Sequence, residues 1–228
     1  MSERENIFAR IREALQTPSP LSLHGGVAHE TNAGASQNRT SRKWLPLVGT
    51  SFDERVTLFS RNAADLKAEF YLLDDWGAAS NLLLQMRESG SWKLLGTHQG
   101  DLTEAARKAL GLPTCHTDQP YDVNELESCD AAITECDALI AQTGSVLVTG
   151  RSAGGRALSV LPPHHVVLAR REQLIGDLTD AFDLLKQKYG EQYPSFISFI
   201  TGPSRTGDIE RVLVLGAHGP RKLTILCF

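Results

Sequence analysis

Residues 199–228, FITGPSRTGDIERVLVLGAHGPRKLTILCF, combine two apolar runs with two polar loops. The runs 211–215 and 223–226 are rich in branched apolar residues, which indicates buried strands. A loop dense in Gly, Pro and hydroxyl residues, 201–208, precedes the first run, and the loop 216–220 joins the two runs. Loops of this kind beside buried strands often carry ligand-binding groups, although a plain connecting turn is the alternative.

Upstream of this stretch, strand and helix patterns alternate. Apolar runs predict strands at 68–73, 92–95, 131–133, 146–149 and 164–168. Helical spacing predicts helices at 51–66, 76–90, 101–111 and 174–190, each ending at or near a glycine or turn, and Thr134 with Asp137 predicts a further short helix over 136–141. The alternation implies βαβ crossovers, so we expect a three-layer, Rossmann-like α/β fold with a largely parallel sheet.

The first 43 residues differ in composition from the rest. Ile7, Ile11 and Leu15 recur at helical spacing, which predicts an amphipathic helix over 1–16, separate from the main domain. Residues 17–43 have few large apolar side chains, which predicts a flexible linker before an α/β domain over 44–228. The N-terminal helix could dock a partner or a neighbouring subunit, or be a tethered end.

Charge and composition exclude several classes of function. The net charge of −4 and the pI near 6.0 provide no basic field for a nucleic acid backbone. No apolar run reaches the roughly 18 residues that a membrane span requires, and the N-terminus lacks a secretory signal, so we expect a cytoplasmic protein. Its four cysteines lack the spacing of a metal or iron–sulfur clip, which predicts that the chain itself binds neither.

Polar candidates follow several of the predicted strands. The turn Thr143, Gly144, Ser145 offers backbone N–H groups and hydroxyls, unless its glycine serves turn geometry alone. Arg205, between Ser204 and Thr206, is a candidate anion clamp, with a solvated arginine as the alternative. Because the carboxyl ends of parallel strands meet at one edge, we expect the candidates to converge there.

Histidines and acids add further candidates. His218 could reach a ligand or be satisfied by local backbone. Alternation along a strand allows only one of His164 and His165 to line a shared pocket. Asp208 and Glu210 could fix Arg205 or cap the next element, and no nucleophile–base arrangement is legible.

The segments 131–148, 161–167, 198–210 and 216–220, taken in order, resemble the motifs of the lactate utilization (LUD) domain family. The resemblance covers about residues 44–228 and is most specific from Ala131 onward. The positions that match the family motifs and that we take as candidate ligand-binding residues are Thr143, Gly144, His164, Gly202, Ser204, Arg205, Thr206, Asp208, Glu210, His218 and Gly219, and Ser145 is added from its place in the turn. Where the family usually has Glu before Thr-Gly, this chain has Gln142.

The resemblance implies a fold similar to the ribose-5-phosphate isomerase, glucosamine-phosphate deaminase and CoA-transferase group. It also implies membership of a system that oxidises L-lactate to pyruvate, with iron–sulfur clusters on the A- and B-type partner proteins and none on this chain. The chain could then be a non-cluster subunit that binds a small carboxylate or other anion. A stand-alone enzyme acting on a phosphorylated sugar or CoA ester is one alternative, and a non-catalytic sensor or scaffold is another.

Overall fold

The computed structural model describes residues 47–209, 212–215 and 219–228, with backbone only for 206–209 and 212–215. The predicted N-terminal helix (1–16), the predicted linker (17–43) and the predicted start of the domain at Trp44 lie outside the described residues. Glu210 and His218 lie outside them as well.

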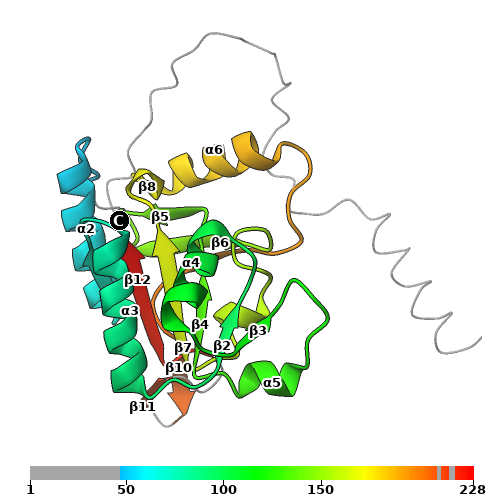
Figure 1. The fold of residues 1–228 in the computed structure, drawn as a ribbon. Coiled ribbons are helices and arrows are strands. Elements are labelled where there is room, and N and C mark those ends of the chain that lie inside the picture. The colour runs from blue at the N-terminus through cyan, green and yellow to red at the C-terminus, as the bar shows by residue number, and fades with distance from the viewer. Residues whose placement is uncertain (1–46, 210–211, 216–218) are drawn as a thin grey trace, which may run out of the picture. The chain divides into compact units, whose positions relative to one another are not determined.

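A parallel sheet of six strands forms the centre of the domain (Figure 1). In spatial order the strands are β1 (Glu69–Leu72), β12 (Lys222–Cys227), β7 (His164–Ala169), β4 (Ala131–Thr134), β2 (Leu95–Thr97) and β3 (Thr114–His116). Each neighbouring pair is parallel, which confirms the predicted α/β class and the predicted sheet. The apolar residues of β7 and β12 are buried on both faces of the sheet, as is usual for parallel strands.

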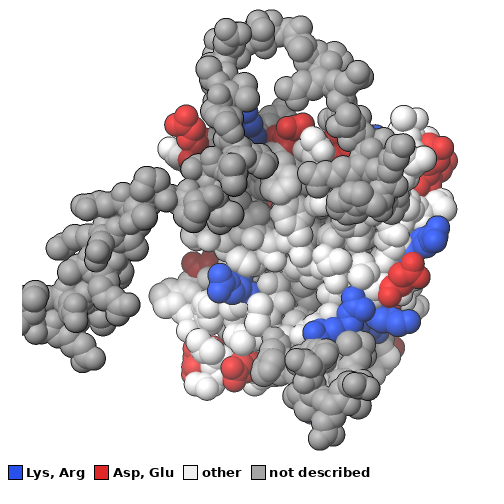
Figure 2. Space-filling view, turned by 180° about the vertical axis from the view of Figure 1, so that it is seen from behind, with Lys and Arg blue, Asp and Glu red and all other residues white. Residues whose placement is uncertain are grey.

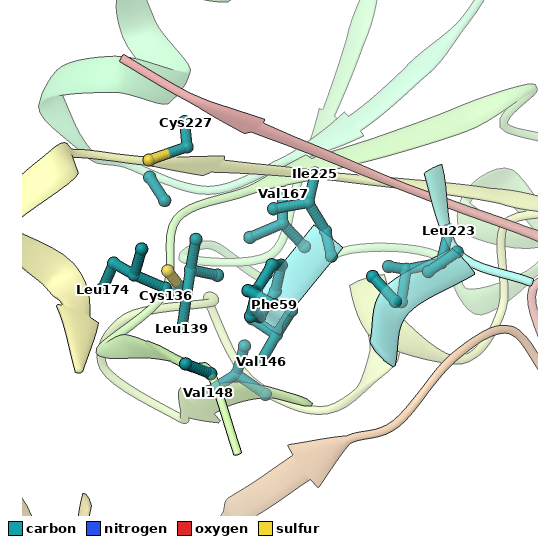
Figure 3. Close-up of a cluster of buried hydrophobic side chains, with 14 of the residues drawn as sticks. Phe59, Cys136, Leu139, Val146, Val148, Val167, Leu174, Leu223, Ile225 and Cys227 are labelled. Carbon is teal, nitrogen blue, oxygen red and sulfur yellow. The ribbon is translucent and has the colours of Figure 1, made fainter. Parts of the chain in front are cut away.

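Helices cover one face of this sheet. They are α3 (Trp76–Gly90) and α4 (Asp101–Leu110), whose Leu83 and Leu110 pack with Val166, Leu168 and Leu226 of the sheet. The other face packs on α2 (Phe52–Asp65), and Figure 3 shows Phe59 of this helix among side chains of the sheet. No helix in the described ranges has the length and apolar character that crossing a bilayer demands.

A second sheet, which the sequence patterns do not predict, lies on the α2 side. Its strands in spatial order are β8 (Leu174–Ile175), β5 (Ala138–Ile140), β6 (Ser145–Thr149) and β9 (Ile197–Ile200). Leu139, Val146 and Val148 point from it toward the parallel sheet (Figure 3). Its other face, with Ile140 and Leu147, is covered by α6 (Leu178–Tyr189).

Two helix predictions were wrong in this region. Residues 138–140 form a strand and not a helix, because they pair with β6 while Asp137 turns inward to α6 instead of capping a helix. The helix predicted from 174 starts only at Leu178, where Asp177 caps it, and Leu174–Ile175 pairs with β5.

Smaller shifts occur elsewhere. The strand predicted at 92–95 is β2, Leu95–Thr97. Helix α3 ends at Gly90 as predicted, but the left-handed residue that caps it is Ser91 (φ 51°) and not the glycine. The connection 113–129 contains β3 and a short helix, α5 (Val123–Glu127). Short 3₁₀ helices occupy Ala157–Ser159 and Arg171–Gln173.

The stretch 199–228 also folds differently from its prediction. Residues 201–208 are not all loop, because β10 (Arg205–Ile209) begins within them. β11 (Val212–Leu215) pairs with β10 in an antiparallel hairpin, whereas β12 joins the main sheet as predicted. Figure 1 shows this hairpin at the amino ends of β7 and β12.

Candidate functional site

A cavity of about 270 Å³ lies at the amino ends of β7 and β12, beside the last residues of β9. Two polar loops of the stretch 199–228 meet at this cavity, namely 201–204 and 219–220. Hydroxyl groups, glycines and apolar side chains share its wall. The described residues that line it are Ser159, Val160, His165, Ile200, Thr201, Gly202, Pro203, Ser204, Gly219, Pro220 and Leu223.

Close backbone contacts hold the two loops together. The Ser204 N–H donates to the Pro220 carbonyl oxygen at 2.8 Å. A Cβ on Gly219 would lie 2.9 Å from Ser204 Cβ, so a side chain there would push the loops apart. Gly202 has φ +86°, and a Cβ on it would lie 2.6 Å from the Leu66 carbonyl oxygen at the end of α2. The sequence therefore places glycine where the loops pass each other and where they meet α2.

His165 is the most deeply buried polar side chain among the described residues of this cavity wall, with an exposed fraction of 1%. Its Nε2 lies 2.8 Å from Thr134 Oγ1, and its buried Nδ1 has no hydrogen-bond partner among the described residues. Burial lowers the pKa of His165 to about 3, so the imidazole is neutral at physiological pH. A neutral ring with one nitrogen held by Thr134 can offer the other nitrogen to a ligand as a single donor or acceptor.

His164 points to the opposite face of the sheet. Its ring packs edge-on against Trp92 at 5.3 Å, and its Nε2 lies 2.8 Å from Thr224 Oγ1. Burial lowers the pKa of His164 to about 4. The structure thus places His165 at the cavity, although His164 is the family motif position. The alternation of side chains along a strand predicts that only one of the two lines the cavity, but it does not indicate which one.

The turn Thr143, Gly144, Ser145 is separate from the cavity and packs on α2. A Cβ on Gly144 (φ +65°) would lie 2.8 Å from the Ala63 backbone nitrogen, and Asn62 Nδ2 donates to the Gln142 carbonyl oxygen at 3.0 Å. Only Ser145 connects with the cavity, through its hydroxyl 2.8 Å from that of Thr201. Glycine is therefore required at position 144 by the geometry of the turn and by its close packing against α2.

The remaining candidates lie beside the cavity or outside the described side chains. Arg205 follows Ser204 and is exposed, but it is not part of the cavity wall. Thr206 and Asp208 lie in β10, where only the backbone is described. The proposed roles of Arg205, Thr206, Asp208, Glu210 and His218 remain predictions.

The expected convergence at the carboxyl ends of the parallel strands was wrong. Gly202, Ser204 and Gly219 gather at the amino ends of β7 and β12, since β9 runs antiparallel to β6 in the second sheet and delivers its loop there. The sequence patterns did not predict that sheet, so they could not place this loop. Ser159 and Thr201, which the sequence reasoning did not select, also line the cavity.

A second buried polar group, Asp137, belongs to the packing between β5 and α6. Its Oδ1 accepts hydrogen bonds from Lys188 Nζ at 2.5 Å and from the Tyr189 hydroxyl at 2.6 Å. Burial raises the pKa of Asp137, but these bonds and the nearby Ser152 hydroxyl outweigh it, so its pKa is lowered. The Tyr189 hydroxyl is also 3.0 Å from Thr149 Oγ1, so Asp137 Oδ1 belongs to a network that links β5, β6 and α6, whereas the buried Oδ2 has no hydrogen-bond partner among the described residues.

Metal ligands do not gather in the described part of the chain: it contains no group of three or more His, Cys, Asp and Glu arranged to hold an ion. Its cysteines are buried and free, and burial raises the pKa of the Cys136 thiol well above its ordinary value. Figure 2 shows acidic and basic side chains interspersed on the face seen from behind, wherever atoms are not grey. Charge on that face therefore acts locally and not as a broad field.

Comparison with known proteins identifies relatives over most of the chain. Residues 56–227 match the family model of the LUD domain. "Lactate utilization protein C" of Shouchella clausii (strain KSM-K16) is 36% identical over 190 residues, which cover 81% of this chain and 83% of the relative. The protein of the same name from Bacillus velezensis (strain DSM 23117 / BGSC 10A6 / LMG 26770 / FZB42) is 33% identical over 235 residues, covering 97% and 94%.

A solved structure has a similar fold. It is the crystal structure, at 1.70 Å resolution, of a DUF162 family protein from Deinococcus radiodurans, which matches with a TM-score of 0.57. The match covers 80% of this chain and 99% of that chain at 20% sequence identity. The family model spans well over half of the sequence, and the chain therefore belongs to the LUD domain family.

Proposed function

We propose that this protein takes part in lactate utilization, as a component that carries no iron–sulfur cluster and works with cluster-bearing partner proteins of the A and B types. The observation that carries the proposal is the match to proteins called lactate utilization protein C along most of both chains. In this role the chain binds the substrate or product and its partners supply the electron acceptors for the conversion of L-lactate to pyruvate.

The cavity at the amino ends of β7 and β12 has the size and the polar groups to bind a small ligand. Its volume of about 270 Å³ lies just below the range of roughly 300–1,000 Å³ that drug-sized ligands occupy. His165 Nδ1 and the hydroxyl groups of Ser204 and Thr201 are suited to bind a carboxylate and a hydroxyl or keto oxygen. Arg205, next to Ser204, would supply the positive charge that a carboxylate requires.

Calorimetric titration of the full chain with L-lactate and with pyruvate tests the ligand. We expect binding of at least one of them, weakened about tenfold by Ser204→Ala, because one hydrogen bond to a charged group contributes roughly 1.5 kcal/mol. Ser60→Ala, an exposed serine on α2, is the matched control and should leave the affinity unchanged. Absence of binding by the wild-type chain would exclude the cavity as a lactate or pyruvate site.

Affinity purification of the tagged chain from cells grown on L-lactate tests the partners. We expect co-purifying proteins that contain iron and acid-labile sulfide, and no iron in the chain after it is separated from them. Purification of the chain without any iron-containing protein would contradict the proposed division of roles.

A further inference from the structure

A second and larger hollow, of about 700 Å³, lies between three segments that are far apart in the sequence. The first segment, 117–118, follows β3; the second, 150–156, follows β6; and the third, 193–196, precedes β9. None of the candidate residues chosen from the sequence lies in its wall. It is therefore a distinct place in the fold from the cavity beside His165.

This hollow lies at the carboxyl ends of β2 and β3. Thr117 directly follows β3, and its N–H donates to the Thr97 carbonyl oxygen at the end of β2. The loop 150–156 reaches the same end, because the Thr117 hydroxyl donates to the Gly154 carbonyl oxygen at 2.7 Å. Open α/β sheets bind their ligands outside the carboxyl ends of their strands, so the hollow lies where such a fold accommodates a ligand.

Two glycines determine the backbone conformation of the 150–156 loop. Gly154 has φ +61°, and a Cβ on it would lie 2.2 Å from His98 Cβ, so only glycine allows the loop to pack this closely on the residue after β2. Gly155 has φ +100° with no atoms within 4 Å of where its Cβ would be. The main chain at Gly155 is thus open to the hollow, and a ligand can approach it without meeting a side chain.

Arg151 and Arg156, one near each end of this loop, both line the hollow. The Arg151 guanidinium stacks on the Tyr189 ring at 5.4 Å, and that of Arg156 stacks on the Phe196 ring at 5.5 Å. Neither forms an ion pair with any residue whose position the structure gives, whereas Arg107, Arg170 and Arg171 each lie within 4.0 Å of a carboxylate. Stacking orients a guanidinium while leaving its in-plane N–H groups available to an anion.

Asp118 is the carboxylate in the described wall of the hollow, and it is already engaged. Its Oδ2 accepts a short hydrogen bond from the Gln99 N–H, which ties the segment after β3 to the segment after β2. The wall therefore combines two arginines without acidic partners, an open glycine backbone and one acid held in a structural bond. Two guanidinium groups complement a dianion such as a phosphate, which each can contact through paired hydrogen bonds.

We propose that this hollow binds a small molecule carrying a phosphate or pyrophosphate group, with Arg151 and Arg156 contacting the phosphate oxygens. The volume of the hollow leaves room for an organic part beside the phosphate, along the exposed ring of Tyr193. The proposal does not depend on the lactate cavity, because the two sites share no lining residue.

Calorimetric titration of the full chain with inorganic pyrophosphate, and with inorganic phosphate in parallel, tests this site. We expect pyrophosphate to bind, and Arg151→Gln and Arg156→Gln each to weaken its affinity by about tenfold or more, as loss of a charge-assisted bond would. Arg171→Gln is the matched control: Arg171 also stacks on an aromatic ring, that of Phe52, but lies 3.9 Å from Asp74, and its variant should bind as the wild type does. Thermal unfolding of each variant verifies that it is folded.

Three results would overturn the proposal. The wild-type chain could show no heat of binding with either anion, or Arg151→Gln and Arg156→Gln could both bind pyrophosphate with unchanged affinity. Succinate could also bind more tightly than pyrophosphate in a manner that both substitutions abolish, which would identify a dicarboxylate site instead.

Discussion

His165 is buried and also lines a cavity, whereas its sequence neighbour His164 is buried but does not line the cavity. Both histidines of the pair are buried and have a lowered pKa. His165 lines a cavity and its Nδ1 has no hydrogen-bond partner among the described residues, whereas His164 is held between Trp92 and Thr224. The register of one strand decides this difference, because adjacent residues of a strand point to opposite faces. A ligand in the cavity would supply the partner that Nδ1 lacks.

The buried imidazole of His165 should make the stability of the protein depend on pH. Its folded pKa of about 3 is below its unfolded value, so its contribution is complete above the unfolded pKa near 6.5 and is lost as the pH falls toward the folded pKa. When the pH is lowered from 6 to 5, the unfolding free energy of the wild type should decrease more than that of His165→Gln. We expect the difference between the two decreases to be at most about 1.4 kcal/mol. Urea denaturation at the two pH values measures this, and equal losses in the two proteins would contradict it.

At the scale of single elements, the start of α4 shows how a distant residue replaces a local cap. Asp101 and Glu104 have the three-residue spacing of a capping box, but the N-cap is Gly100, which has no side chain to offer. Glu135, at the end of β4, instead accepts the Leu102 N–H at 2.8 Å and the Thr103 N–H at 3.3 Å. A carboxylate at a helix N-terminus also complements the helix dipole.

Removing the Glu135 carboxylate should destabilise the domain more than removing that of Asp101. We expect Glu135→Ala to lower the unfolding free energy by about 1 kcal/mol and Asp101→Ala by less than about 0.5 kcal/mol, because Asp101 is exposed and its carboxylate is 4.0 Å from Arg170. Chemical denaturation of the two variants compares them. An equal or larger cost for Asp101→Ala would show that the local box is the effective cap.

The turn between β5 and β6 gives a second test at this scale. Gly144 and Gly111 both have positive φ, but a Cβ on Gly111 would meet nothing within 4 Å, whereas one on Gly144 would lie 2.8 Å from the backbone of α2. Alanine at either position bears the left-handed backbone cost, and at Gly144 we expect about 1–3 kcal/mol of additional destabilisation from overpacking. Equal unfolding free energies for Gly144→Ala and Gly111→Ala would show that the turn does not depend on its packing against α2.

The sequence was sufficient where local pattern and tertiary environment agree. The strands β6, β7 and β12 contain apolar runs that are visible in the sequence, and those runs are buried in the structure. It was misleading where the decisive partner is distant: Thr134 and Asp137 imitate a helix start, yet Asp137 binds Lys188 and Tyr189, 51 and 52 residues further along. Short strands such as β5 and β8 depend on these long-range pairings, so local patterns alone could not predict the second sheet.

The candidate site was predictable to a similar degree. The loops 201–204 and 219–220 are prominent in the sequence and do meet at a cavity. The choice between His164 and His165, and the edge of the sheet on which the cavity lies, depend on strand register and on the direction of β9. The hollow beside Arg151 and Arg156 requires segments after β3 and β6 to meet, which no local pattern announces.

At the scale of the whole molecule, the parallel sheet holds two hollows apart. One lies at the amino ends of β7 and β12 and suits a small ligand; the other lies at the carboxyl ends of β2 and β3 and carries two arginines without acidic partners among the residues the structure describes. The two hollows share no lining residue among those described. Substitutions at one hollow should therefore leave ligand binding at the other unchanged.

Growth of a strain that lacks the gene tests the role in lactate utilization most directly. With L-lactate as the sole carbon source, we expect the deletion strain to grow poorly or not at all, and a plasmid copy of the wild-type gene to restore growth. With pyruvate as the sole carbon source, the deletion strain should grow as the parent does, because the step that produces pyruvate is bypassed. Undiminished growth of the deletion strain on L-lactate would contradict the proposed function.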